Sequence, residues 1–238
     1  MASNAPVKVL VTGFGPFLDV TTNPSWEIAR RLPASILGLD GQSIQVIVPE
    51  ASMPAAYHNI KAQVASLIDT HAPDLVVHMG LDVDSGPGVF KIERTAPKEG
   101  YHEFPDIRRK VFTRVENKKE FAKAPASLTT SLDVGAAEEI WRAACAPIIV
   151  TLATSKVSQQ NAKKGTQPAK QNVRVELSDD VGTYVCGFCY YVALLHLQSH
   201  TGKRHAVFLH VPPLETEADI LVGVRVIEEV VRALVHVM

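Results

Sequence analysis

Two cysteines stand three residues apart in the stretch GTYVCGFCYY, residues 182–191, and the chain has only one other cysteine. Cys186 and Cys189 could form a redox pair, contribute to a metal site, or include one nucleophile beside a cysteine that takes no part. A redox Cys-x-x-Cys motif usually lies at the start of a helix after a strand, as this one roughly does. The spacing leaves all three kinds of chemistry open.

A zinc site would need four converging ligands, and Cys186, Cys189, His196 and His200 have suitable side chains. In one continuous helix, a rise of about 1.5 Å per residue separates Cys186 from His200 by roughly 20 Å. Such a helix does not allow the four residues to share one ion. We therefore expect no metal ligands and no cofactor in the site.

Cys186 alone is the third possibility. The polar, glycine-containing turn at 178–183 precedes a helical run, so Cys186 falls in or near the first turn of that helix. Free backbone N–H groups and the positive end of the helix dipole lower the pKa of a thiol there and can stabilise an oxyanion. Cys189 lies one turn further among apolar residues and is predicted to be a small buried side chain. An inert core thiol at Cys186 is the alternative.

A nucleophilic cysteine needs a base within hydrogen-bonding reach, and histidine is the usual one. His210 ends an apolar run and precedes Val-Pro-Pro, which places it at the carboxyl end of a strand, where α/β enzymes keep their sites. Glu93, next to a short apolar strand, could orient the imidazole. The alternatives are a hydrogen-bonded core histidine and a surface carboxylate paired with Lys91 or Arg94.

The segment VTGFGPF, residues 11–17, follows the first predicted strand. A nucleotide-binding G-x-G-x-x-G loop would need a third glycine where Leu18 stands, and Pro16 lacks the N–H that a phosphate would use. A turn that presents Phe14 and Phe17 suits an apolar pocket better.

Short β-branched runs alternate with amphipathic segments, which predicts an α/β fold. We expect a single three-layer domain over residues 1–238, with a twisted, mostly parallel sheet and helices on both faces. The predicted strands are 8–12, 43–48, 75–78, 148–152 and 206–210, and the predicted helices are 25–31, 53–68, 132–144, 184–197 and 217–236.

Two segments interrupt this alternation. Residues 95–123 are charged, contain Gly and Pro, and show little periodicity, so we expect a long surface loop. Residues 155–172, SKVSQQNAKKGTQPAKQN, contain almost no apolar side chains and are predicted to be a flexible insertion.

The composition excludes several classes of protein. Lys plus Arg number 24 against 25 Asp plus Glu, a formal net charge of −1, so a nucleic-acid partner is not expected. No apolar run reaches the ~20 residues of a membrane span, and the first residues lack the pattern of a signal peptide. Three cysteines do not make a disulfide framework, and we expect a cytoplasmic protein.

Five segments, in this order, resemble the pyroglutamyl peptidase I (pyrrolidone-carboxylate peptidase) family of thiol enzymes. They are VTGFGPF at 11–17 with NPSW at 23–26, LVVHMG at 75–80, IER at 92–94, GTYVC at 182–186 and FLHVP at 208–212. The resemblance spans nearly the whole chain and implies a phosphorylase/hydrolase-like α/β fold. Gly100-Tyr101 and Val211-Pro-Pro213 look more like eukaryotic members.

The resemblance implies a cysteine-type omega peptidase that removes an N-terminal pyroglutamyl residue from small peptides. Cys186 would be the nucleophile, His210 the general base and acid, and Glu93 the group that orients His210. A related thiol amidase with an altered pocket, or a binding protein of this fold that has lost activity, is the alternative. The sequence leaves open whether the protein is a monomer or a homo-oligomer.

The resemblance also implies a substrate pocket. Its expected lining residues are Phe14, Phe17, Asn23, Tyr184 and Val185, with Asn23 near the lactam. A five-membered lactam is flat, small and uncharged, so aromatic walls with one or two polar groups should bind it and disfavour a charged amino terminus.

The chain also departs from bacterial members of the family. Gly187 follows the cysteine where those members typically have asparagine. The segment HEFPDI, residues 102–107, replaces a bacterial Arg-Ile-Pro-Asp-Asn loop, so the arginine of that loop has no counterpart here.

Overall fold

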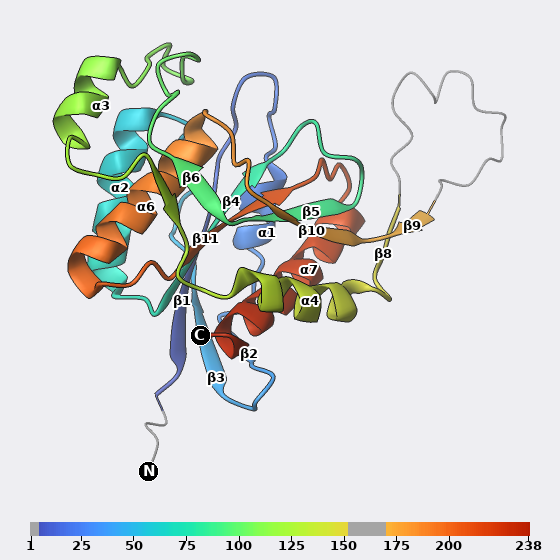
Figure 1. The fold of residues 1–238 in the computed structure, drawn as a ribbon. Helices are drawn as coiled ribbons and strands as arrows, with labels where there is room; N and C mark the ends of the chain where they lie inside the picture. Colours follow the sequence, from blue (N-terminus) through green and yellow to red (C-terminus); the bar gives the residue numbers. More distant parts are fainter. Residues whose placement is uncertain (1–4, 152–169) are drawn as a thin grey trace, which may run out of the picture.

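A twisted sheet of seven strands forms the centre of the computed structural model, which describes residues 5–151 and 170–238 (Figure 1). The strand order is β10-β5-β11-β4-β1-β3-β2. The pairs β10–β5, β11–β4, β4–β1 and β1–β3 are parallel, whereas β5–β11 and β2–β3 are antiparallel. The strands are β1 (Val7–Gly13), β2 (Ser35–Leu37), β3 (Ser43–Ile47), β4 (Leu75–Leu81), β5 (Val89–Glu93), β10 (Arg174–Ser178) and β11 (Ala206–Val211).

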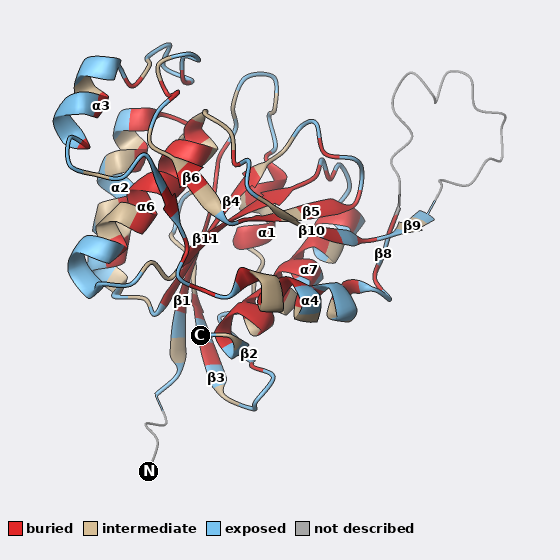
Figure 2. Cartoon of the chain, viewed as in Figure 1, coloured by how far each residue is buried: buried red, intermediate tan, exposed pale blue. Residues whose placement is uncertain are grey.

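Helices cover both faces of the sheet, as the sequence predicts. On one face, α1 (Pro24–Ala29), α4 (Val134–Cys145) and α7 (Glu217–His236) pack on an aliphatic core. On the other face, α2 (Tyr57–His71) and α6 (Val185–Thr201) pack on a core rich in aromatic side chains. Figure 2 shows the central strands buried between these two layers, as expected for a largely parallel sheet. The predicted three-layer α/β fold is therefore confirmed.

Local signals explain where several helices begin. Thr216 forms a capping box with Asp219 at the start of α7, and the predicted helix 217–236 matches α7 at both ends. Asn23 caps α1 through its side chain, and Pro24 occupies the first helical position. The helix predicted at 53–68 begins instead at Tyr57, because Met53 forms a β-bridge with Phe14.

The strand predicted at 148–152 does not join the central sheet. It forms β8 (Ile149–Thr151), which pairs only with β9 (Lys170–Asn172) in an antiparallel ribbon within the described residues. Ile149 is half exposed, so the expectation of a fully buried strand is wrong. The predicted insertion at 155–172 lies outside the described residues up to 169, and its last three residues form β9.

The surface loop predicted at 95–123 is more ordered than its composition suggests. It contains β6 (Thr95–Pro97), which pairs with β7 (Ser127–Thr129), and the capped helix α3 (Arg114–Glu120). It also buries three aromatic side chains against α2 and α6, namely Tyr101, Phe112 and Phe121. The prediction was wrong because these aromatic residues follow no short period.

The longest helix in the described part of the chain is α7, with 20 residues. None of the described helices is both long enough and apolar enough to cross a membrane.

Candidate active site

Strands β5 and β11 bring Glu93 and His210 together on the face covered by α6. Because side chains alternate along a strand, His210 shares this face with Phe208, two residues earlier. The antiparallel register places Glu93 directly opposite Phe208. As a result, the Oε1 atom of Glu93 lies 2.8 Å from Nδ1 of His210, and the Glu93 side chain is fully buried.

The contact with Glu93 determines how the imidazole of His210 is used. A carboxylate oxygen accepts, so Nδ1 donates its proton to Glu93 and Nε2 is left for Cys186. Burial lowers the pKa of His210, but hydrogen bonds with Cys186 and Glu93 outweigh it and raise the pKa to about 10. The surroundings of His210 therefore favour the imidazolium form.

A glycine in β4 makes room for the thiol of Cys186. Gly80 lies directly opposite His210 in the parallel pair β4–β11. A Cβ atom on Gly80 would approach Sγ of Cys186 to 2.8 Å, closer than real Cβ contacts. The thiol thus sits over the backbone of Gly80, beside the imidazole.

Cys186 is the second residue of α6 and lies at the positive end of its dipole. Tyr184 is the N-cap in extended conformation, and no side chain in the described part of the chain caps this end. Backbone N–H groups of the first turn are available to a ligand as a result. Cys189, one turn further, is fully buried, as predicted, and burial raises the pKa of its thiol.

The turn before α6 explains why glycine follows the cysteine. Gly182 adopts a φ of +76°, a left-handed conformation that glycine adopts without strain. Its carbonyl oxygen would lie 2.0 Å from a Cβ atom at position 187. Glycine is therefore the only residue type that fits this backbone at position 187 without a shift.

A small pocket of about 40 Å³ opens beside the thiol. Its lining residues are Phe14, Phe17, Asn23, Ala55, Leu81, Tyr184, Val185 and Cys186. All five residues that the sequence assigned to a substrate pocket thus line one cavity together with the thiol. Such a volume has room for only a small group.

The first loop is held in place largely by Asn23. Its Oδ1 accepts from the backbone N–H of Ser25 at 3.1 Å and from the hydroxyl of Ser25 at 2.8 Å. Its Nδ2 donates to the carbonyl oxygen of Gly15 at 3.1 Å, and the Ser25 hydroxyl in turn accepts from the N–H of Phe14 at 3.0 Å. Asn23 therefore shapes the loop that carries Phe14, and one N–H of its amide is left for a ligand.

Tyr184 contributes a polar atom to this pocket. Its hydroxyl is buried and has no hydrogen-bond partner among the described residues. Tyr57, which the sequence analysis did not single out, packs its ring edge-on against that of Tyr184, with 6.1 Å between the centroids. Tyr57 in turn donates its backbone N–H to Asp106 at 3.1 Å, so the 95–123 segment supports the pocket.

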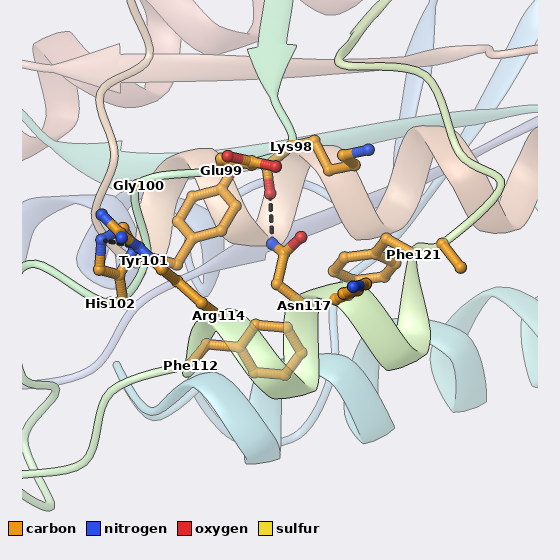
Figure 3. A pocket seen from close by; sticks show the side chains of 11 residues that line it. Lys98, Glu99, Gly100, Tyr101, His102, Phe112, Arg114, Asn117 and Phe121 are labelled. Atoms are coloured by element: carbon orange, nitrogen blue, oxygen red, sulfur yellow. Dashed lines mark hydrogen bonds between the residues drawn. The ribbon is translucent and has the colours of Figure 1, made fainter.

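A larger cavity of about 260 Å³ lies outside this pocket, between the 98–102 segment and α3 (Figure 3). It is lined by the rings of Tyr101, Phe112 and Phe121, and Asn117 donates to the carbonyl oxygen of Lys98 at 2.6 Å across it. None of Cys186, His210 and Glu93 lines this cavity. The chemistry of the residues therefore places the candidate active site at the smaller pocket.

Comparison with known proteins identifies the family of this chain. The pyroglutamyl peptidase family model matches residues 7–147, which include Glu93 but end before Cys186 and His210. Human pyroglutamyl-peptidase 1 is 30% identical over 208 residues, which are 87% of this chain and 79% of that protein. The pyrrolidone-carboxylate peptidase of Pseudomonas fluorescens is also 30% identical, over 210 residues, 87% of this chain and 78% of its own length.

The fold agrees over a longer stretch than the family model does. The crystal structure of pyroglutamyl peptidase I from Bacillus amyloliquefaciens superimposes with a TM-score of 0.67 and covers 98% of this chain and 95% of its own. At 19% sequence identity, this likeness shows the fold alone. The family model and the human relative together show that the chain belongs to the pyroglutamyl peptidase family.

Proposed function

We propose that this protein is a cysteine peptidase that removes an N-terminal pyroglutamyl residue from small peptides. The observation that carries the proposal is the placement of Cys186, which lies beside the His210–Glu93 pair and lines a small pocket with three aromatic residues. Membership of the family supports the same activity.

In the acylation step, the thiolate of Cys186 attacks the carbonyl carbon of the pyroglutamyl residue, and a carbon–sulfur bond forms. Backbone N–H groups of the first turn of α6 stabilise the oxyanion that develops on the carbonyl oxygen. His210 then gives the proton on Nε2 to the leaving nitrogen, and the carbon–nitrogen bond breaks. Glu93 holds the ring in position and stabilises its charged form through Nδ1.

In the deacylation step, His210 takes a proton from water, and the oxygen attacks the thioester carbon. The carbon–sulfur bond breaks, pyroglutamate leaves as the acid, and the thiolate and imidazolium of the starting state are restored. All protons in this cycle pass through one ring nitrogen, so no further titrating group is required.

The pocket accounts for selection of the lactam. Phe14 and Phe17 provide apolar walls for a flat ring, while the Tyr184 hydroxyl and the remaining N–H of Asn23 can bind its amide. A charged amino terminus would lose its hydration in such a pocket without gaining a carboxylate partner. Peptides with a free N-terminal residue should therefore bind poorly.

The test compares a fluorogenic pyroglutamyl substrate with the matching prolyl and acetyl-blocked substrates. We expect hydrolysis of the pyroglutamyl substrate alone, abolished by alkylation of Cys186 and unaffected by EDTA. Turnover of the prolyl or acetyl substrate at a similar rate would assign the protein to another class of thiol amidase. No turnover, together with ordinary thiol reactivity at Cys186, would indicate a binding protein.

Glu93→Gln tests the role assigned to Glu93. The amide keeps the size of the carboxylate but no longer favours the imidazolium, so kcat should fall by at least about 10-fold while KM changes little. An unchanged kcat would remove Glu93 from the proposed mechanism.

A further inference from the structure

Two histidines of α6 and an aspartate of α2 meet at the end of α6 that lies opposite Cys186. Asp69, His196 and His200 each offer one ligand atom, and these atoms lie within 4.8 Å of one another. His196 and His200 are one turn apart on the helix, and their rings stack with 4.0 Å between the centroids. Nε2 of His196 lies 2.7 Å from Oδ1 of Asp69.

The hydrogen bonds of this cluster leave nitrogen lone pairs available. Nδ1 of His200 lies 2.8 Å from the carbonyl oxygen of His196, and a carbonyl oxygen only accepts, so Nδ1 carries the proton. Nε2 of neutral His200 is then an unprotonated donor atom for a metal. A backbone carbonyl that accepts from the other ring nitrogen is also one of the common supports for a metal-binding histidine.

The positions on the two helices also favour a cation. Asp69 lies in the last turn of α2, which ends at His71, and His200 lies in the last turn of α6, which ends at Thr201. Both helices therefore direct their negative C-terminal ends toward the cluster. Asp69 adds a carboxylate that is more than half exposed, so a hydrated ion can reach it.

We propose that Asp69, His196 and His200 form a surface binding site for a divalent transition-metal ion, with Zn²⁺ as the best match. Two imidazoles and one carboxylate form a ligand set that suits zinc, which also accepts water in a fourth position. The ion would replace the proton between His196 and Asp69. At bond lengths of about 2 Å, the ligand atoms of a tetrahedral zinc ion lie about 3.3 Å from one another, so the widest separation in this cluster needs to close by up to roughly 1.5 Å.

This site is separate from the chemistry of the thiol. Helix α6 is continuous from Val185 to Thr201, and the helical rise places His200 roughly 20 Å from Cys186. The prediction of no metal ligands considered only an ion that all four cysteines and histidines of α6 would share. Asp69, 127 residues from His196 in sequence, could not be recognised as a partner without the fold. A bound ion would join α2 to α6 and stabilise the folded state.

The experiment measures Zn²⁺ binding by calorimetry and thermal unfolding on the full chain, without chelating reductants. All proteins carry Cys186→Ala. This substitution removes the thiol–imidazole pair of the active site as a second zinc site, and the readout is binding, not activity. The key variant is His200→Ala, because it removes one ligand but keeps the hydrogen bond between His196 and Asp69. The control is His58→Ala, which removes a similar pair, His58 with Glu116 at 2.8 Å, between α2 and α3.

We expect one equivalent of Zn²⁺ to bind the parent and raise its Tm by about 5 °C at a hundredfold excess over Kd. His200→Ala and Asp69→Asn should each weaken binding by at least about 10-fold, whereas His58→Ala should bind like the parent. Cobalt in place of zinc should give visible absorption bands that His200→Ala changes. Equal zinc affinity in parent and His200→Ala, or no Tm shift in the parent, would overturn the proposal.

Discussion

Cys186 and Cys189 lie on consecutive turns of α6, but they differ in burial and in the groups beside them. Cys186 is partly exposed, next to His210 and the free N–H groups of the helix end. Cys189 is completely buried, and burial raises the pKa of its thiol. Of the two thiols, only that of Cys186 therefore has both access to a substrate and a histidine beside it.

Replacing each cysteine by alanine should separate these roles. Cys186→Ala removes the nucleophile, so kcat/KM should fall by about 1,000-fold or more with the fold intact. Cys189→Ala leaves a small cavity that costs ~1 kcal/mol of unfolding free energy, and kcat/KM should stay near that of the wild type. Steady-state kinetics and urea unfolding check both. Equal catalytic loss in the two variants would instead indicate dithiol chemistry.

The Tyr184 hydroxyl permits a second test at the level of one atom. If it binds the lactam amide, Tyr184→Phe removes one hydrogen bond, and KM should rise by about 10-fold with a smaller change in kcat. Tyr191→Phe is the matched control, because that hydroxyl donates to the carbonyl oxygen of Pro125 at 2.7 Å and does not line the pocket. A KM that changes equally in both variants would mean that Tyr184 acts through stability.

At the scale of elements, the first turn of α6 depends on close contact with the turn before it. In Gly187→Ala, the added Cβ would meet the carbonyl oxygen of Gly182 at 2.0 Å, so this end of the helix must shift. We expect a loss of about 2 kcal/mol of unfolding free energy and a lower kcat, because the same turn carries Cys186.

Gly135→Ala in α4 is the control for this substitution. Its Cβ would meet only Oδ1 of Asp133 at 3.5 Å, an ordinary contact, so the helix should gain up to ~1 kcal/mol. Urea unfolding and kinetics of both variants check the prediction. If Gly187→Ala behaved like Gly135→Ala, the proposed fit between α6 and the Gly182 turn would be wrong.

The sequence predicted those helices and strands whose apolar residues recur regularly within one short segment. The apolar periodicity of residues 217–236 predicted α7, and the apolar run that ends at His210 predicted most of β11. The edge strand β10 has only one buried residue, Val175, so its sequence gives a weak signal. Helix α3 was missed because its residues are almost all charged, and only its capping box at Thr113 marks it.

The pocket residues were named from motifs, but their convergence depends on the fold. Gly80 ends the LVVHMG segment at 75–80, yet only the β4–β11 register places it under the thiol of Cys186. Tyr57 supports Tyr184 through a contact between segments more than 100 residues apart in the sequence, and no periodic pattern reports such a contact. The catalytic roles of Cys186, His210 and Glu93 stay predictions until the variants are measured.

At the scale of the whole molecule, a buried histidine links stability to pH. His78 lies in the central strand β4, and its Nδ1 is 2.6 Å from the Thr12 hydroxyl in β1. Burial lowers the pKa of His78 to about 3, so the ring is neutral in the folded protein at pH 5. In the unfolded chain it binds a proton below about pH 6.5.

The unfolded state therefore binds more protons between pH 6.5 and 3, and stability falls as the pH falls through this range. Between pH 7 and 5 this effect amounts to about 2 kcal/mol of unfolding free energy. His78→Asn keeps a polar group near Thr12 but does not titrate, so it should lose about 2 kcal/mol less than the wild type. Urea unfolding at both pH values measures the difference. Equal losses in the two proteins would show that His78 is not responsible.

The β8–β9 ribbon is a position at which insertions and deletions should be tolerated. Thr151 and Lys170 face each other in the ribbon, outside the central sheet and away from the pocket. The chain thus leaves and re-enters the described structure at adjacent points, so the distance to be bridged is independent of how many residues lie between them. The family model ends at residue 147, just before this ribbon. Residues added or removed between Thr151 and Lys170 should accordingly leave the central sheet and the pocket unchanged.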